Sequence, residues 1–234
     1  MTKPQSLSLG IGAAAALCAL LGVALGGLAG LALGYTAAGC ALVALAYARN
    51  WPGVFGKRGG RVPLARALAL LPFLSAYRLA CFGMRQARRW PACSQVAPGL
   101  YVGGRPRAVD LPDEVEFVLD LCAEFSEARA IRSRRGYRSL AILDGHTPPD
   151  ESLFLALLRE LCAGPGALLI HCESGRGRAP TAAAAALLVS GAAPDVATAV
   201  EWVRKGRPQS HPTRSDLAFL ARLERRIAAE RRAR

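Results

Sequence analysis

The sequence predicts an α/β domain, a central sheet flanked by helices, preceded by an N-terminal transmembrane helical hairpin. Three observations lead to this prediction: an uneven distribution of charge, a long uncharged apolar run, and strand-like segments that alternate with helix-like ones in the second half of the chain. A chain of 234 residues has room for one domain of ordinary size and an accessory region, but not for two full enzymatic domains.

Charge divides the chain near residue 91. The first 91 residues contain 10 Lys and Arg and no acidic residue, whereas the rest contain 20 Lys and Arg and 17 acidic residues, so most of the net charge of +13 belongs to the first part. A basic, acid-free flank beside an apolar run is typical of a membrane protein, for which anionic lipid is the expected partner. Charge alone is weak support for nucleic-acid binding, and we expect no nucleic-acid partner.

The apolar run extends from residue 7 to residue 48 without one charged residue. As a helix it would measure about 63 Å, which is about two bilayer cores, and it far exceeds the roughly 7 to 15 apolar residues of a signal peptide. We expect two spans, near residues 7–26 and 30–48. Lys3 before the run and four basic residues after it, within residues 49–61, place both ends on the cytoplasmic side.

Four glycines recur every four residues in this run, at Gly22, Gly26, Gly30 and Gly34. Small residues at this spacing are typical of helix faces that pack closely in lipid, but a glycine can equally mark the turn of a hairpin. The sequence leaves both interpretations open, together with chance in a segment rich in Gly and Ala.

Within the segment that follows the apolar run, residues 62–91 are apolar but interrupted by arginines. Only 11 uncharged residues separate Arg66 from Arg78, too few for a third span. We expect a segment that lies in the membrane interface, with a core helix of the following domain as the alternative. Pro72 argues against one straight helix in either case.

The predicted organisation is a membrane anchor in residues 1–50, an interfacial linker in 51–91 and one folded domain in 92–234. Within that domain, strand-like runs occupy residues 100–102, 115–122, 140–143 and 167–172. Helical spacing is found in residues 150–162, 178–190, 195–205 and 213–229. Strands interleaved with helices predict a sheet covered by helices.

The chain has seven cysteines, an odd number, with no Cys-x-x-Cys pair and no metal-ligand spacing. We therefore expect no disulfide framework, no metal and no cofactor. Cysteines in apolar or core segments, such as Cys122 and Cys162, are best interpreted as small buried hydrophobes. Only Cys172 has neighbours that suggest chemistry.

Residues 168–181 read LLIHCESGRGRAPT, an apolar strand that ends in a cysteine, then a glycine-bearing loop and the start of a helix. Such a turn can aim backbone N–H groups at an anion, and the helix N-terminus adds partial positive charge. Gly175 and Gly177 would let the loop curl inward, and Arg178 could grip two phosphate oxygens in a fork that Lys cannot form. The other residues expected to line the anion site are His171, Glu173, Ser174 and Arg176.

The same dipoles and Arg178 favour the thiolate form of Cys172. A thiolate that faces bound phosphate is a nucleophile for phosphorus. The alternative, a buried cysteine in a glycine turn, explains neither the arginine nor the position of the loop between strand and helix. His171 could orient the loop or simply pack in the core.

The pattern His171-Cys172-x5-Arg178 resembles the signature loop of the protein tyrosine phosphatase superfamily, in particular its dual-specificity branch, over roughly residues 95–230. The resemblance implies the cysteine phosphatase fold, a phosphocysteine intermediate and no metal. It also implies an aspartate general acid on a separate loop before the signature.

The segment LDGHTPPD, residues 143–150, resembles the acid loop of that family. This implies that Asp144 protonates the leaving oxygen and later takes a proton from water. Asp144 and the following glycine could instead form a simple turn, with Asp150 as the substitute acid.

The match to the family fails at one position. Ala179 stands where the family usually carries Ser or Thr, whose hydroxyl helps the cysteine leave the intermediate, and Thr181 is displaced from that position. Loss of the hydroxyl predicts slow breakdown of the phosphoenzyme.

The rim of the pocket sets the substrate, and the sequence leaves two classes. The class we favour is phosphoprotein at Tyr, Ser or Thr. The other is a membrane phospholipid headgroup of phosphoinositide or phosphatidylglycerophosphate type, which Arg176 would help to bind and Glu173 would repel. The non-enzymatic alternative is a membrane scaffold that recognises phosphate with little turnover.

A reactive thiolate survives best in reducing surroundings, so we expect the domain in the cytoplasm. The composition, rich in Ala, Arg and Gly, suggests a bacterial inner membrane as the location of the anchor.

Overall fold

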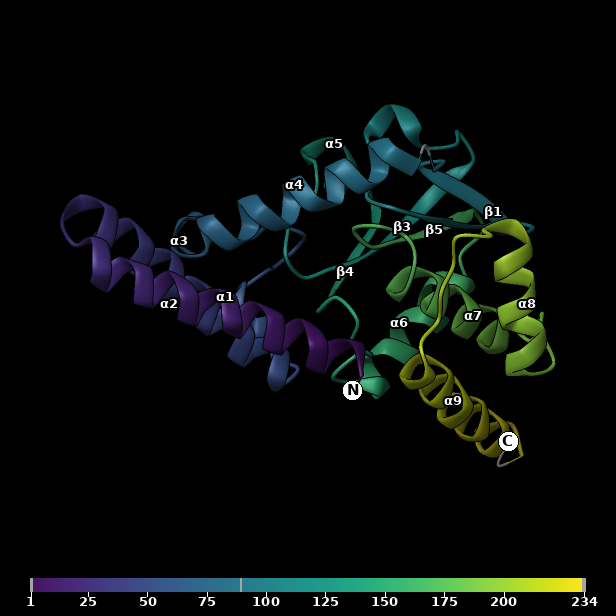
Figure 1. The fold of residues 1–234 in the computed structure, drawn as a ribbon. Coiled ribbons are helices and arrows are strands. Elements are labelled where there is room, and N and C mark those ends of the chain that lie inside the picture. Colours follow the sequence, from purple (N-terminus) through teal and green to yellow (C-terminus); the bar gives the residue numbers. More distant parts are fainter. Residues whose placement is uncertain (1, 89, 233–234) are drawn as a thin grey trace. The chain divides into compact units, whose positions relative to one another are not determined.

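The computed structural model describes residues 2–88 and 90–232. It separates into two compact units, which we call the N-terminal unit (Met1–Arg89 with Ala123–Ser126) and the C-terminal unit (Trp90–Cys122 with Glu127–Arg234). Figure 1 shows the first unit as long helices and the second as a sheet with helices around it. The predicted bounds at residues 50 and 91 remain a prediction, because compactness alone does not define an anchor or a linker.

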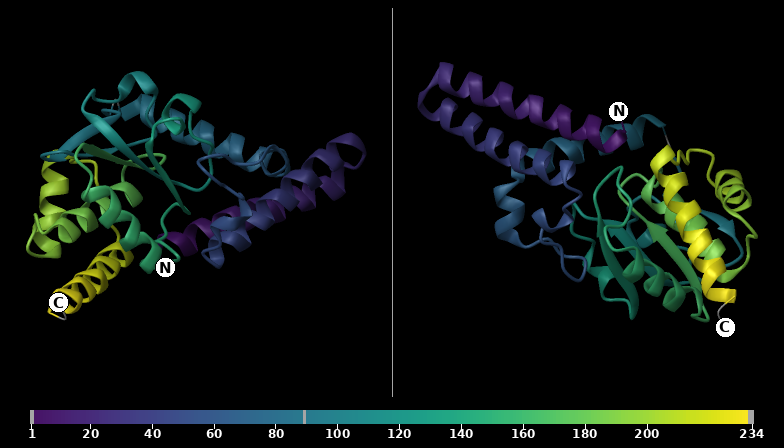
Figure 2. Two further views of the ribbon diagram at one scale, coloured as in Figure 1. Left: turned by 180° about the vertical axis from the view of Figure 1, so that it is seen from behind. Right: turned by 90° about the horizontal axis from the view of Figure 1, so that it is seen from below.

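The N-terminal unit begins with two antiparallel helices, α1 (Lys3–Leu25) and α2 (Gly27–Ala48), which lie side by side in both views of Figure 2. The turn between them is shorter than the predicted gap between residues 26 and 30. Gly26 and Gly27 both adopt positive φ, at 59° and 55°, a conformation that costs glycine little and other residues more. Two such residues reverse the chain, so α2 begins three residues earlier than we predict from sequence.

Two other glycines of the predicted repeat, Gly22 and Gly30, serve packing. A Cβ atom on Gly30 would lie 2.6 Å from the carbonyl oxygen of Gly22 on the facing helix, so only glycine allows this close approach. A Cβ atom on Gly34 would meet nothing within 4 Å. The repeat therefore combines one turn glycine, one pair of contact glycines and one glycine without a steric requirement.

Both helices are long and apolar enough to cross a membrane. The mean hydropathy of their most apolar stretches is 2.2 and 1.8, yet only 11% and 17% of those stretches are buried within the protein. Many large apolar side chains are consequently exposed, among them Leu9, Leu17, Leu20, Val23, Leu25, Leu28 and Leu31. Lipid would cover such a surface at no hydrophobic cost.

After α2 and a 3₁₀ turn (Pro52–Val54), the chain forms α3 (Leu64–Ala69) and α4 (Leu71–Arg88). The break falls just before Pro72, which lacks an N–H and is tolerated in the first turn of a helix but not in its interior. On α4, Phe73 and Tyr77 stack at 5.8 Å, and Tyr77 stacks on Phe125 at 5.6 Å. On the same helix Leu79 and Phe82 are exposed.

The C-terminal unit contains a five-stranded sheet of order β1-β2-β5-β3-β4, in which β1 pairs antiparallel with β2 and the other pairs are parallel. The strands are β1 (Cys93–Ala97), β2 (Leu100–Gly103), β3 (Val115–Cys122), β4 (Gly136–Ile142) and β5 (Ala167–His171). The α/β prediction is confirmed. Two details differ: β1 is absent from the prediction, and β4 starts four residues earlier than residue 140.

Both differences have the same cause. β1 is a half-exposed edge strand reading CSQVA, and the early part of β4 carries Arg138 and Ser139, so neither segment has the apolar run that marks a strand. The central strand β5 is the opposite case, because all five of its residues are buried, as is typical of a parallel strand covered on both faces.

The C-terminal unit also has four long helices, of which the first lies between β4 and β5 in the chain and the others come after β5. They are α6 (Glu151–Cys162), α7 (Arg178–Ser190), α8 (Val196–Gly206) and α9 (Arg214–Arg232). Their apolar residues form one core cluster with Leu168 and Ile170 of β5, so they cover one face of the sheet, as Figure 1 shows. Leu169 points to a smaller cluster on the other face, which includes Ile131 of the short helix α5 (Arg129–Arg132) and Leu111, next to a 3₁₀ turn (Ala108–Asp110).

This topology fixes the place of the cysteine. β5 is the middle strand of the sheet and ends at His171, and α7 begins at Arg178. Residues 172–178, which we call the Cys172 loop, therefore lie at the carboxyl edge of the sheet, where α/β proteins place their ligand sites.

Candidate active site

Cys172 is held at the bottom of its loop. Only 1% of the residue is exposed, and its backbone N–H donates to the Gly103 carbonyl at 3.4 Å. The backbone N–H of Gly175 donates to the Cys172 sulfur at 3.3 Å. A donor aimed at sulfur stabilises the thiolate form, as a nucleophile requires.

Gly175 needs to be glycine, and Gly177 does not. Gly175 has φ +68°, and a Cβ atom there would lie 2.5 Å from the backbone of Gly103 and Gly104. Gly177 has φ −119° and open space around its Cβ position. The expectation that both glycines let the loop curl thus holds for Gly175 and is wrong for Gly177, because the curl is complete before the chain reaches it.

Three carbonyl groups of the Cys172 loop are turned outward and accept hydrogen bonds from elsewhere in the unit. The bonds are Arg105 N–H to Glu173 O (3.0 Å), Arg207 Nε–H to Gly175 O (2.8 Å) and His211 N–H to Arg176 O (2.8 Å). In a planar trans peptide the following N–H points the opposite way. The N–H groups of Ser174, Arg176 and Gly177 therefore point away from these donors, toward the concave side of the loop, and form a nest suited to an anion.

Arg178, the first residue of α7, is anchored rather than free to turn outward. Its side chain is 1% exposed, and Nη1 donates to the Ile142 carbonyl at 2.6 Å. Its Nη2 lies 3.6 Å from Oδ1 of Asp144, whose side chain is 19% exposed. The end of β4 thus brings the predicted acid and the predicted arginine together.

The segment after β4 is both a turn and a site for an acid, so the two interpretations do not exclude each other. Gly145 has φ +78°, and the His146 N–H donates to the Leu143 carbonyl at 3.1 Å. This turn carries Asp144 to Arg178. Asp150 has a different role: its Oδ1 accepts from the N–H groups of Ser152 and Leu153, both at 2.9 Å, and so caps α6.

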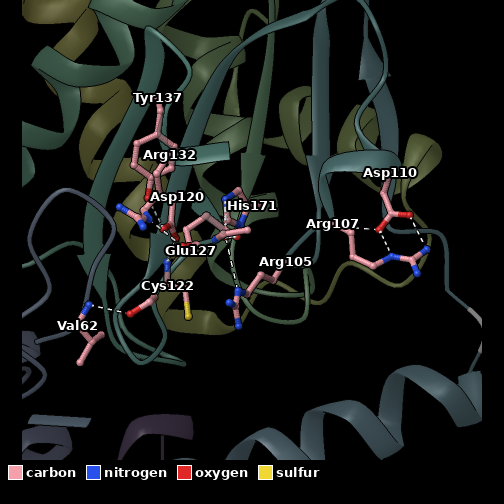
Figure 3. Close-up of polar contacts among 12 residues, drawn as sticks. Val62, Arg105, Arg107, Asp110, Asp120, Cys122, Glu127, Arg132, Tyr137 and His171 are labelled. Atoms are coloured by element: carbon pink, nitrogen blue, oxygen red, sulfur yellow. Dashed lines mark hydrogen bonds and ion pairs between the residues drawn. The ribbon is translucent and has the colours of Figure 1, made fainter. Parts of the chain in front are cut away.

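His171 is fully buried behind the loop, in a polar network shown in Figure 3. Its Nε2 lies 3.5 Å from Oε2 of Glu127, and the same oxygen lies 3.6 Å from Nε of Arg105. Tyr137 donates to Asp120 at 2.6 Å, and burial followed by the Asp120 carboxylate raises the pKa of Tyr137 well above its usual value. The network joins the end of β5 to β3, β4 and the segment after β2, where the Arg105 N–H also binds the Glu173 carbonyl of the Cys172 loop.

Asp120, Glu127 and His171 offer donor atoms within 4.8 Å of one another, close enough to consider a metal. Both carboxylate oxygens of Asp120 and Oε1 of Glu127 already accept hydrogen bonds, and Oε2 of Glu127 lies in ion-pair range of Arg105 and His171. Asp120 accepts from Tyr137 and from the Cys122 N–H (2.9 Å), and Glu127 accepts from the Ala128 N–H (2.7 Å). These bonds identify the cluster as a hydrogen-bond network of the protein.

The remaining loop side chains differ in exposure. Glu173 is buried, whereas Ser174 and Arg176 are half-buried. The guanidinium carbon of Arg176 lies 5.0 Å from the ring of Trp90, a cation–π distance. Arg176 is therefore held against an aromatic ring at the start of the C-terminal unit.

Ala179 is buried in the first turn of α7. Thr181 lines a small cavity between α7, α8 and α9, together with Ala184 and Val203. Thr181 thus belongs to a space between helices.

Sequence reasoning does not identify Arg105, Glu127 and Arg207 as parts of the site. Arg207 stands in a basic helix end, where the sequence suggests only a match to the helix dipole. Glu127 follows β3 at a short distance, and an acid after a buried strand could have been the signal for it. Their partners in the Cys172 loop lie far away in sequence, so spacing alone does not connect them.

Comparison with known proteins agrees with this geometry. Residues 115–226 match the family described as "Swiss Army Knife protein, DSP-PTPase phosphatase domain". No curated protein matches the chain.

Among solved structures, Tk-PTP in the active form is 26% identical and superposes with a TM-score of 0.50, covering 58% of this chain and 99% of that one. A glycine-to-alanine mutant form of Tk-PTP is 27% identical with the same TM-score, covering 60% and 99%. A single-residue mutant of human DUSP28, at 22% identity and a TM-score of 0.50, covers 60% and 99% and shares the fold.

Proposed function

Residues 115–226 belong to the dual-specificity branch of the protein tyrosine phosphatase superfamily, and from this premise we propose that the protein is a cysteine-dependent phosphatase that hydrolyses phosphate monoesters. The observation that carries the proposal is the convergence of Cys172, Arg178 and Asp144 at the carboxyl edge of the sheet. The Gly175 N–H faces the sulfur at 3.3 Å, and Asp144 lies 3.6 Å from Arg178.

In the first step the thiolate of Cys172 attacks phosphorus and the bond from phosphorus to the leaving oxygen breaks. Asp144 gives its proton to that oxygen, so the product leaves as a neutral alcohol or phenol. Arg178 and the loop N–H groups bind the equatorial phosphate oxygens, whose charge they stabilise in the transition state.

In the second step water attacks the phosphorus of phosphocysteine, and Asp144, now ionised, takes a proton from it. The S–P bond breaks, inorganic phosphate forms, and the thiolate of Cys172 returns. Without a hydroxyl at Ala179 the leaving thiolate has one donor fewer, so this step is the slower one. No metal or cofactor takes part in either step.

For the substrate, phosphoprotein at Tyr, Ser or Thr remains our proposal. The second candidate is a phosphorylated lipid headgroup, and the position of Arg176 supports it. That guanidinium lies beside the Trp90 ring, within the loop that would hold the reacting phosphate, and could bind a second phosphate group. The buried carboxylate of Glu173 argues against a lipid headgroup with several phosphates, because burial reduces screening and strengthens the repulsion.

We further propose that the helices α1 and α2 span a membrane as a hairpin, with residues 51–91 in its interface and the catalytic unit in the cytoplasm. Support comes from the hydropathy and exposure of the two helices and from the basic, acid-free flanks. In the linker, exposed leucines and Phe82 stand among arginines, a composition that suits a bilayer with anionic lipid. A bacterial inner membrane is the location we propose.

The test is phosphate release by the full chain in detergent micelles. The panel is a phosphotyrosine peptide, a phosphoserine peptide and phosphorylated lipids, with EDTA present and Cys172→Ser alongside. We expect turnover that EDTA leaves unchanged and that Cys172→Ser abolishes, and the preferred substrate decides between protein and lipid. Phosphate binding without turnover on any substrate would contradict the enzyme and favour a phosphate-recognition scaffold.

A further inference from the structure

Arg207, the residue after the last turn of α8, is an arginine in an unusual place for a charged side chain. It is 1% exposed, the largest of the fully buried side chains in the described part of the chain. Burying a guanidinium costs several kcal/mol unless its N–H groups are satisfied, so a protein keeps one where its bonds are needed.

The hydrogen bonds of Arg207 join two parts of the C-terminal unit. Nε donates to the Gly175 carbonyl at 2.8 Å. Nη1 donates to the other side, where its acceptors are Ser94 Oγ (3.1 Å), the Val102 carbonyl (3.1 Å) and the Pro91 carbonyl (3.4 Å). Arg207 therefore fixes the Cys172 loop to the β1–β2 pair through one planar group.

Arg207 holds the residue whose N–H faces the thiol, through the carbonyl of the next peptide. The N–H of Gly175 donates to the Cys172 sulfur, while the carbonyl of the same residue accepts from Arg207. Because the peptide between residues 175 and 176 is planar, fixing its carbonyl outward also fixes the Arg176 N–H inward. One side chain thus sets the direction of the Arg176 N–H and restrains Gly175, whose own N–H faces the sulfur.

The positive charge of Arg207 also affects the peptide to which it is bonded. A cation bonded to a carbonyl oxygen polarises the peptide and strengthens the hydrogen bond that the following N–H donates. Of the three donors that hold the loop carbonyls, those of Arg105 and His211 are backbone N–H groups, and only that of Arg207 is a side chain.

We propose that Arg207 is a positioning residue for the proposed phosphatase reaction. It holds the Gly175–Arg176 peptide so that the Arg176 N–H binds phosphate, and it restrains Gly175 so that the N–H of that residue stays directed at the Cys172 thiolate. This role rests on the proposed function for its use in catalysis, but its effect on Cys172 can be measured without turnover.

The test compares Arg207→Met with Arg204→Met in the full chain in detergent micelles. Both variants lose one positive charge at the end of α8, but Arg204 is exposed. The readout is the rate at which iodoacetamide alkylates Cys172 from pH 5 to pH 9, located by mass spectrometry. We expect Arg207→Met to slow alkylation at pH 6.5 about tenfold and to move the pH profile upward, because the variant loses the charge-assisted hydrogen bond that holds Gly175. Arg204→Met should leave the profile unchanged.

A folded Arg207→Met variant with the wild-type alkylation profile would overturn the proposal. If Arg207→Met does not fold, Arg207→Lys decides, with Arg204→Lys as its control. Lysine keeps the charge, but one ammonium cannot reach Gly175 and the β1–β2 acceptors together, so slower alkylation than in Arg204→Lys is expected. Equal rates in the two lysine variants would overturn the proposal.

Steady-state kinetics on p-nitrophenyl phosphate separates this proposal from the proposed function. If the wild type turns over no phosphate ester while Arg207→Met still shifts alkylation, the positioning role of Arg207 is supported and the proposed phosphatase function is wrong. If the wild type is active and Arg207→Met matches Arg204→Met in both kcat and alkylation, the proposed phosphatase function is supported and the positioning role of Arg207 is wrong.

Discussion

The α1–α2 hairpin and the Cys172 loop owe their conformations to different surroundings. Most side chains of the hairpin are exposed, and its defining contacts are a two-residue glycine turn and the close approach of Gly22 and Gly30. In the Cys172 loop the thiol accepts a hydrogen bond from the Gly175 N–H of the same loop, and the arginine and three outward carbonyls are bonded to other parts of one unit. The loop is thus specified by protein contacts, whereas the hairpin leaves most of its apolar side chains exposed, as its proposed role as a membrane span requires.

The largest effect expected at the Cys172 loop is the fall in kcat when the proposed general acid, Asp144, is removed. Asp144→Asn should lower kcat about a hundredfold to ten-thousandfold, which is the usual worth of a general acid. The loss should be greater for phosphoserine than for p-nitrophenyl phosphate, because only the poorer leaving group needs the proton. Stopped-time phosphate release on both substrates measures the ratio.

Asp150→Ala is the matched control for that experiment. Removal of the α6 cap should destabilise the domain by about 1 kcal/mol and leave the substrate ratio unchanged. If Asp150→Ala and not Asp144→Asn changes the ratio, the two aspartates have been assigned the wrong roles.

The next largest effect is the difference in alkylation rate between Cys172, the proposed nucleophile, and Cys162. Burial raises the pKa of Cys162 to about 11, so at pH 7 only about one molecule in ten thousand carries its thiolate. We expect iodoacetamide at pH 7 to label Cys172 at least about a hundredfold faster than Cys162. The Cys162 rate should rise about tenfold per pH unit until the pH approaches 11. Peptide mapping that finds equal labelling at pH 7 would remove the chemical distinction between the two.

On the hairpin side, Gly30→Val tests whether the glycine contact holds the two helices together. Its Cβ atom would meet the Gly22 carbonyl oxygen at 2.6 Å, so we expect the hairpin to lose about 1–3 kcal/mol. Gly34→Val is the control, because its Cβ atom would meet nothing within 4 Å. Unfolding of the full chain by SDS, followed by circular dichroism, measures the difference. Equal stability of the two variants would mean that the helices do not pack through Gly22 and Gly30.

The smallest expected effect is an increase in steady turnover. Ala179→Ser restores the hydroxyl that the superfamily uses to help the thiolate leave, and it should raise steady turnover about fivefold while removing an initial burst of product. Ala182→Ser, a buried position on the same helix, controls for the added hydroxyl. A wild-type time course that is linear from the start would show that breakdown of the intermediate is not slow.

The sequence predicts those helices, strands and loops whose apolar pattern or motif lies within a few neighbouring residues. The buried runs of β3 and β5, the helices α6 to α9 and the loop between β5 and α7 all carry their signal within a few residues, so their predicted bounds agree with the structure to within three residues. β1 escapes prediction because half-exposed Cys93–Ala97 has neither an apolar run nor clear alternation.

Long-range partners escape prediction for a different reason. Arg207 and Gly175, or Glu127 and His171, meet only because the topology brings separate strands and helices to one edge of the sheet. A single sequence predicts which residues react but not which residues hold them, and Gly177 shows that even a residue inside the motif can lack the steric role expected of it.

The most direct test of the central claim is to trap the intermediate. The full chain in micelles is mixed with a phosphotyrosine peptide, quenched in acid within the first turnover, digested and mapped by mass spectrometry. We predict phosphate on Cys172, present in the wild type, more abundant relative to turnover than in Ala179→Ser, and absent in Cys172→Ser. Phosphate release by the wild type with no adduct on Cys172, and with activity retained in Cys172→Ser, would contradict the account.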